Sequence, residues 1–146
     1  MIHYGMDGKV ALVTSAGSGI GRAAALAFAH SGAAVMVSDV NEASGAETVA
    51  MIEAAGGKAR FRRCDVGNGD DIAALVHGTV SAFGALDFAF NNAGVNRLEA
   101  DEYEDDNWAL SINVNLTGVM RCMREEARVM LANGGGAIVN TASING

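Results

Sequence analysis

The chain has 146 residues, of which 50% are hydrophobic and 18% are charged. It is therefore too apolar to be disordered and long enough to bury the core of one domain. Its net charge of −7 argues against nucleic acid as a partner, because binding to phosphates requires a basic surface.

The sequence indicates a cytoplasmic protein. The longest uncharged stretch, residues 129–146, is half Gly, Asn, Ser and Thr, whereas a membrane span needs about 20 mostly apolar residues. The first residues contain neither a basic nor an apolar segment, so no secretory signal is expected. Two cysteines, Cys64 and Cys122, are too few for a disulfide framework, and we expect them to be inert packing residues.

In chain order, short apolar runs alternate with Ala-rich segments of helical length. The runs predicted to be strands are residues 9–14, 33–39, 58–63, 86–90 and 137–141. The segments predicted to be helices are residues 20–31, 42–55, 70–83 and 105–132. This alternation predicts an α/β fold, a parallel sheet with helices on both faces, in one domain over residues 1–146. An acidic run at residues 99–106 is expected to be a solvated loop that leads into the last helix.

A glycine-rich turn joins the first predicted strand to the first predicted helix. It reads Thr-Ser-Ala-Gly-Ser-Gly-Ile-Gly over residues 14–21, and it departs from G-x-G-x-x-G because the third glycine would fall on Arg22. Glycines at such a turn let the backbone approach a ligand, and the helix start offers free N–H groups to a phosphate. Because the turn follows a strand and opens a helix, it favours a nucleotide site over a purely structural turn.

Asp39 ends the second predicted strand, 18 residues after Gly21. In a nucleotide-binding βαβ unit, a carboxylate at this place accepts hydrogen bonds from the adenosine ribose hydroxyls. A 2′-phosphate would meet a like charge there, and neither Ser18 nor the sequence neighbours of Asp39 are basic. The sequence therefore predicts NAD in preference to NADP. The alternative is an exposed aspartate that caps the next helix.

Together with four further segments, these features resemble the short-chain dehydrogenase/reductase family over residues 7–146. The turn is similar to the family's T-G-x-x-x-G-I-G, with Ser15 in place of the first glycine, and we expect a serine there to avoid positive φ. Asp65-Val66 matches the pair after the third strand, and Asn-Asn-Ala-Gly at 91–94 matches the motif after the fourth. Asn115 falls on the Asn of the long helix, and Ser143 falls on the Ser after the fifth strand.

The resemblance implies a Rossmann-type doubly wound sheet with strand order 3-2-1-4-5. It also implies hydride transfer between a nicotinamide coenzyme and a small-molecule alcohol or ketone, with Ser143 and Asn115 as catalytic residues and no metal. The residues that it implies for coenzyme binding are Ser15, Gly17, Ser18, Gly19, Ile20, Gly21, Asp39, Asp65, Val66, Asn91, Ala93 and Gly94.

The long helix at residues 105–132 is expected to serve assembly as well as packing. Its apolar residues cover more than one stripe, and the family is usually a dimer or tetramer through this helix. Within it, we expect Trp108 to be a core anchor and Asn115 to lie in a buried segment, because Val114 and Leu116 flank it.

Hydride transfer from an alcohol needs a group that accepts the hydroxyl proton. In this family that group is a tyrosine followed four residues later by a lysine, and neither Tyr4 nor Tyr103 has a lysine at that position. We therefore expect the chain to be the N-terminal, coenzyme-binding part of a longer protein. Such a part would be incomplete at its C-terminus and inactive alone, and its fifth strand would lie at an open edge.

Two other functions stay open at this point. A non-catalytic dinucleotide-binding module would need the glycine turn and Asp39 but would have no use for Asn115 and Ser143. A methyltransferase turn can also carry glycines spaced as they are from residue 17 to residue 21, but it usually has an acid where Ser15 stands.

Overall fold

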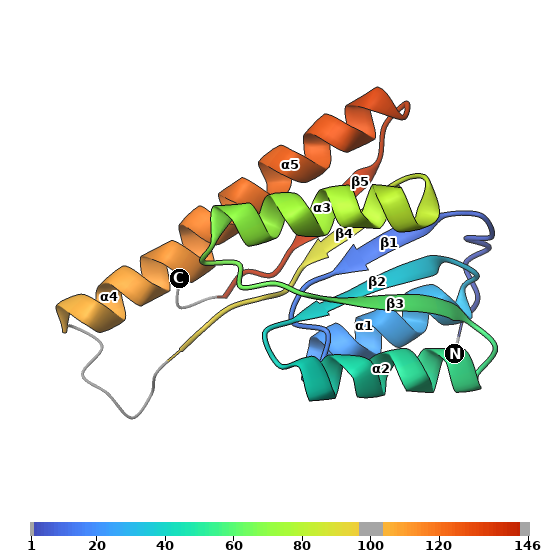
Figure 1. The fold of residues 1–146 in the computed structure, drawn as a ribbon, viewed down its shortest axis with the longest axis horizontal. Helices are drawn as coiled ribbons and strands as arrows, with labels where there is room; N and C mark the ends of the chain where they lie inside the picture. Colours follow the sequence, from blue (N-terminus) through green and yellow to red (C-terminus); the bar gives the residue numbers. More distant parts are fainter. Residues whose placement is uncertain (1, 97–103, 144–146) are drawn as a thin grey trace.

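The computed structural model describes residues 2–96 and 104–143. Its centre is a five-stranded parallel sheet in the order β3-β2-β1-β4-β5, so the predicted strand order is confirmed. The strands are β1 (Val10–Val13), β2 (Ala34–Asp39), β3 (Lys58–Arg63), β4 (Phe88–Asn91) and β5 (Ala137–Asn140). The strands run in one direction, so their carboxyl ends and the turns that follow them lie along one edge of the sheet (Figure 1).

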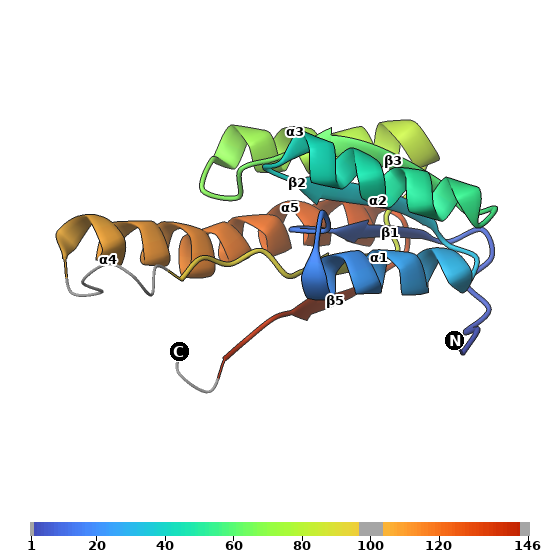
Figure 2. The ribbon, with the colours of Figure 1, turned by 90° about the horizontal axis from the view of Figure 1, so that it is seen from below.

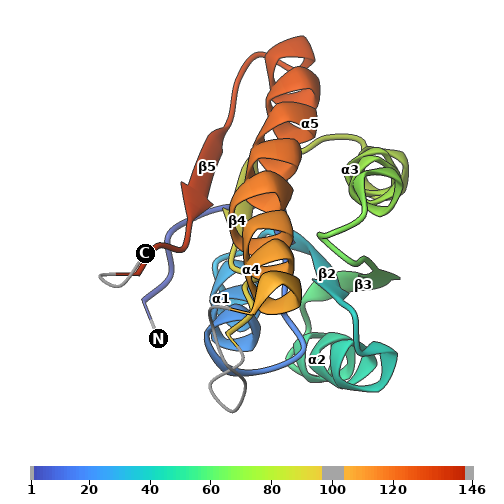
Figure 3. The same ribbon diagram turned by 90° about the vertical axis from the view of Figure 1, so that its left-hand side faces the viewer.

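Helices cover both faces of this sheet (Figure 3). The pair α1 (Gly19–His30) and α2 (Glu42–Ala54) lies on one face, and α3 (Gly69–Phe83) and α5 (Val119–Ala132) lie on the other. Each predicted strand and helix is therefore present, with boundaries shifted by a few residues at most, except in the last helix.

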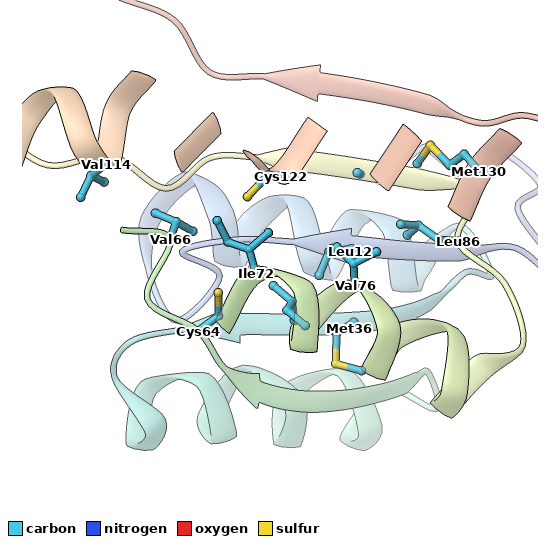
Figure 4. Packing of buried hydrophobic residues seen from close by; sticks show 12 residues of the cluster. Leu12, Met36, Cys64, Val66, Ile72, Val76, Leu86, Val114, Cys122 and Met130 are labelled. Carbon is cyan, nitrogen blue, oxygen red and sulfur yellow. The ribbon is translucent and has the colours of Figure 1, made fainter. Parts of the chain in front are cut away.

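The core is divided by the sheet because alternate side chains of a strand point to opposite faces. Leu12 packs with residues of α3 and α5, while its neighbour Val13 packs with residues of α1 and α2. The cluster under α3 and α5 is shown in Figure 4, where Ile72 and Val76 point from α3 toward Leu12 on β1. This two-sided burial holds the carboxyl ends of β1, β2 and β4 in fixed positions.

The last helix differs from the single helix expected over residues 105–132. It consists of α4 (Asp105–Ser111), the π-helical segment η1 (Ile112–Gly118) and α5, and Figure 2 shows that α4 projects beyond the sheet. Trp108 lies on this projecting part and is 63% exposed, so the expectation of a core anchor is wrong. Asp105 and Asp106 occupy the first turn of α4, whereas residues 99–103 of the acidic run lie outside the described residues.

Both cysteines are free and buried. Burial raises the pKa of the Cys64 thiol to about 12 and also raises the pKa of Cys122, which lies near the carboxyl group of Glu126. Both thiols therefore stay protonated near neutral pH, as expected of packing residues. Among the described helices, none is long and apolar enough to cross a membrane.

Candidate functional site: the carboxyl edge of the sheet

Ser15 adopts a φ of +50°, so the expectation that it avoids positive φ is wrong. The reason is the close packing of α1 on the turn. A Cβ at Gly21 would lie 2.7 Å from the carbonyl carbon of Ser15 and closer still to its oxygen. The left-handed backbone at Ser15 brings that carbonyl directly against the first turn of α1, where only a glycine leaves room for it.

Two side chains brace the glycine turn from the α1–α2 side. Thr48 of α2 is fully buried and donates its hydroxyl to the carbonyl of Ala16 at 2.9 Å. Arg22 donates to Thr48 Oγ1 at 3.0 Å, to the carbonyl of Gly17 and to Glu47 at 2.5 Å. The sequence did not predict these contacts, because Thr48 is far from the turn in the chain and no local pattern marks it.

The start of α1 differs from the starts of α2 and α3. The side chain of Ser18, the residue before α1, makes no capping hydrogen bond, and the first turn holds no acidic residue. By contrast, Asn41 and Asn68 cap α2 and α3, and acidic residues occupy their first turns. The first-turn N–H groups of α1, beside the exposed residues Ser18, Gly19 and Ile20, are therefore suited to an anionic group.

Asp39 joins the end of β2 to the glycine turn. Its Oδ2 accepts a hydrogen bond from the Gly17 N–H at 2.9 Å, and its Oδ1 accepts one from the Asn41 N–H at 3.0 Å. A Cβ at Gly17 would lie 2.8 Å from Oδ2, so only glycine permits this approach. The residue that caps α2 is Asn41, so Asp39 does not act as that cap.

The segment after β4 lies beside the same turn. Thr14 Oγ1 accepts hydrogen bonds from the N–H groups of Asn92 at 3.0 Å and Ala93 at 3.1 Å. Asn91, however, points away from this edge, because its buried side chain donates to Glu126 of α5. Of the predicted residues in this segment, Ala93 and Gly94 lie at the edge and Asn91 lies in the core.

Asn115 lies in η1 and is exposed, so the expectation of a buried segment is wrong. Its amide is nevertheless paired: Oδ1 accepts from the Val95 N–H and Nδ2 donates to the Val95 carbonyl, both at 2.8 Å. This two-way pairing ties η1 to the segment after β4. Of its two apolar neighbours, Val114 is buried and Leu116 is 63% exposed.

Asp65 and Val66 follow β3, next to η1. Asp65 Oδ1 accepts from the Gly67 N–H at 2.8 Å and is exposed, while Val66 is buried. A Cβ at Gly118 would lie 2.6 Å from the Val66 carbonyl, so the glycine in η1 permits close packing there. Asp65 therefore reaches the carboxyl edge from the β3 end of the sheet.

Ser143 follows β5, and it is exposed. The path to it is held by Thr141, whose N–H donates to the Asn91 carbonyl at 2.9 Å and whose hydroxyl donates to Asn92 Oδ1 at 3.2 Å. The turn after β1, Asp39, Asp65, the segment after β4 and Ser143 thus all follow carboxyl ends of strands. In open α/β sheets this edge is where ligands bind.

Comparison with known proteins identifies the family. A family model described as short chain dehydrogenase matches residues 9–146. The chain belongs to the short-chain dehydrogenase family. It is 46% identical over 142 residues to cyclohexanol dehydrogenase of Acinetobacter sp. (strain SE19), covering 96% of this chain and 57% of that protein.

Further relatives agree with this result. The chain is 46% identical over 142 residues to a 3beta-hydroxysteroid dehydrogenase of Mediterraneibacter gnavus, covering 96% of this chain and 51% of the relative. A short chain dehydrogenase/reductase from Burkholderia phymatum in complex with NAD matches with a TM-score of 0.88 and 41% identity. That match covers 97% of this chain and 51% of the solved one. The chain spans about half the length of the curated relatives that it matches.

In this short-chain dehydrogenase chain, the groups along the carboxyl edge of the sheet fit a dinucleotide. The uncapped start of α1 suits a pyrophosphate, and Asp39 has carboxylate oxygens that suit ribose hydroxyls. Among residues 2–96 and 104–143, no three His, Cys, Asp or Glu side chains are grouped so that they could hold a metal ion.

Proposed function

We propose that this chain binds NAD in preference to NADP and serves an oxidoreductase that transfers hydride between the coenzyme and an alcohol or carbonyl substrate. The observation that carries the proposal is the 2.9 Å hydrogen bond from the Gly17 N–H to Asp39 Oδ2. This hydrogen bond joins the glycine turn, which would bind the phosphates, to Asp39, which would bind the ribose. The Burkholderia phymatum protein, whose structure is a complex with NAD, supports the same coenzyme class.

The preference for NAD rests on charge. A 2′-phosphate at Asp39 would face a carboxylate and displace its ribose hydrogen bonds. Arg22 is engaged with Gly17, Thr48 and Glu47, and Arg63, which is beside Asp39 in the sheet register, lies 3.5 Å from Asp71. The Arg22 guanidinium is thus engaged by its own partners, and the charge of Arg63 is paired with that of Asp71.

The chain's own groups suggest how it takes part in the reaction. A bound nicotinamide coenzyme would supply the hydride acceptor or donor. By resemblance, the Ser143 hydroxyl would hydrogen-bond the substrate oxygen, and Asn115 would hold the η1 segment and order a water beside it. Neither side chain ionises near neutral pH, and the 146 residues contain no Tyr-x-x-x-Lys. We therefore propose that this chain alone binds coenzyme without turnover and that a base outside it completes the reaction.

The names of the relatives indicate a class of substrate. The relatives named above act on a cyclic alcohol and a hydroxysteroid by their names, so we propose a small-molecule alcohol or ketone as the substrate.

We also propose that the protein is cytoplasmic and forms a homodimer or homotetramer through the helix α4–η1–α5. Its exposed apolar side chains recur mostly every fourth residue, on one side of the helix. They are Trp108, Ile112, Leu116, Met120, Met123 and Leu131.

The coenzyme proposal is tested by calorimetric titration of the protein with NAD and NADP. We expect NAD to bind at least about tenfold more tightly, which corresponds to about 1.4 kcal/mol. Asp39→Ala should weaken the binding of NAD more than that of NADP, and so reduce the difference between the two affinities. Glu53 is an exposed acid on α2, and Glu53→Ala should leave that difference unchanged. Equal affinities of the wild type, or tighter binding of NADP, would overturn the proposal.

A further inference from the structure

Helix α5 packs against β4 and β5 (Figure 3). A polar cluster lies at this contact, and two of its members, Glu126 and Asn91, are buried. Glu126 of α5 is fully buried, and its Oε2 accepts a hydrogen bond from Asn91 Nδ2 at 2.9 Å. The same Nδ2 donates to Asn140 Oδ1 at 3.0 Å, across the β4–β5 pair in which Asn91 and Asn140 are register partners. Asn140 in turn lies 3.3 Å from the sulfur of Met123 on α5.

This cluster has two buried oxygens without a hydrogen-bond partner, Glu126 Oε1 and Asn91 Oδ1. Two acceptors, Glu126 Oε2 and Asn140 Oδ1, face Asn91 Nδ2, and this network assigns the orientation of the Asn91 amide. A buried acceptor without a donor is costly, and a buried unpaired carboxylate is more so. One proton added to Glu126 would give both of these oxygens a hydrogen-bond partner. With Oε1 protonated, the acid and the amide can pair through N–H to Oε2 and O–H to Oδ1.

We propose that Glu126 is protonated in the native protein and is a positioning residue that, through Asn91, ties the carboxyl ends of β4 and β5 to α5. It would act through Asn91 and not by touching coenzyme or substrate. The segments that it holds are those after β4 and β5, which carry Ala93, Gly94 and Ser143. This consequence for ligand binding rests on the proposed function, whereas the protonation itself does not.

The surroundings of Glu126 support a neutral carboxyl. Burial raises its pKa to about 7, opposed by the hydrogen bond from Asn91. The ionisable side chain coupled to it is Cys122, one turn earlier on α5, which is also protonated. Strands β4 and β5 and segment η1 contain no ionisable side chain. Burial is what raises the pKa of Glu126. The remaining ionisable side chains of α3 and α5 are Asp70, Asp71, His77, Arg121, Arg124, Glu125 and Arg128.

The neighbouring Glu125 provides a matched control. It accepts hydrogen bonds from Arg124 and Arg128, both at 3.0 Å, and these two cations hold its pKa below the usual range. Two adjacent glutamates on one helix are thus both buried but have different partners. Glu125 is held ionised by two arginines, whereas Glu126 has an amide as its partner and is protonated below about pH 7.

The test compares the wild type with Glu126→Gln and Glu125→Gln from about pH 5 to about pH 9. In Glu126→Gln, the new amide can pair with Asn91 at every pH. In infrared spectra at the acid end, we expect a protonated-carboxyl band in the wild type and Glu125→Gln that is absent from Glu126→Gln. At the alkaline end, hydrogen exchange in β5 should be faster and NAD binding about tenfold weaker in the wild type than in Glu126→Gln.

Two results would overturn the proposal. One is the absence of a protonated-carboxyl band assignable to Glu126, which would mean that the carboxylate is ionised and satisfied by a water. The other is an unchanged pH dependence of β5 exchange in Glu126→Gln. If no variant binds NAD at any pH, the proposed function fails, and the infrared and exchange measurements still decide the state and role of Glu126.

Discussion

Gly21→Ala should weaken coenzyme binding while leaving most of the fold in place. The new Cβ would lie 2.7 Å from the carbonyl carbon of Ser15, where ordinary carbon contacts are 3.5 to 4.0 Å, so α1 and the turn must separate by about 1 Å. Both atoms lie close to or within the backbone, so no side-chain rotation can relieve the contact. Overpacking of this kind costs about 1–3 kcal/mol of stability.

The same displacement determines the loss of affinity. A phosphate bound at the start of α1 would hold its hydrogen bonds at about 2.9 Å, and a shift of about 1 Å breaks them. Losing one charge-assisted bond of about 1.5–3 kcal/mol weakens binding about 10- to 100-fold. The assay is calorimetric titration with NAD, combined with urea unfolding of each variant.

Gly56→Ala is the control for backbone strain alone. Gly56 has a φ of +83°, no atom lies within 4 Å of its Cβ position, and it follows α2 at the opposite end from the glycine turn. It should lose about 1 kcal/mol of stability and keep its affinity for NAD. If Gly21→Ala bound NAD as tightly as Gly56→Ala does, the start of α1 would not be the phosphate site, and the reasoning above would be refuted.

Two further predictions concern stability and assembly. The pKa of Glu126 rises from 4.5 to about 7 on folding, so the unfolded state loses its proton first and the free energy of unfolding should fall as pH rises from 4.5 to 7, by about 3 kcal/mol in total. Urea unfolding of the wild type should show this loss and Glu126→Gln should not, and a wild type whose stability did not fall over this range would contradict it. Met120, 48% exposed on the apolar side of η1 and α5, should be covered in the assembled protein, so Met120→Glu should shift sedimentation toward the monomer. A wild type that is strictly monomeric would refute the proposed interface.

Much of the fold was determined by the sequence alone, because its signals are local. Alternating apolar runs and Ala-rich segments predict strands and helices from neighbouring residues only, and the glycine turn could be placed between β1 and α1 for the same reason. Asp39 could be assigned to the end of β2 because the apolar run of residues 33–39 ends there. The strand order came from resemblance to a family whose topology is known, and the structure confirms it.

What only the tertiary structure decided depends on residues far apart in the chain. Ser15 takes a positive φ because α1 folds back onto its carbonyl, which outweighs the local preference of a serine. Trp108 is apolar but lies on a helix that projects beyond the sheet, so its sequence could not reveal its exposure. Glu126 lies beside Glu125 in a charged stretch of the sequence, yet the sheet buries it against Asn91, 35 residues away. Burial and pairing are properties of the packed chain, and they gave these side chains their chemistry.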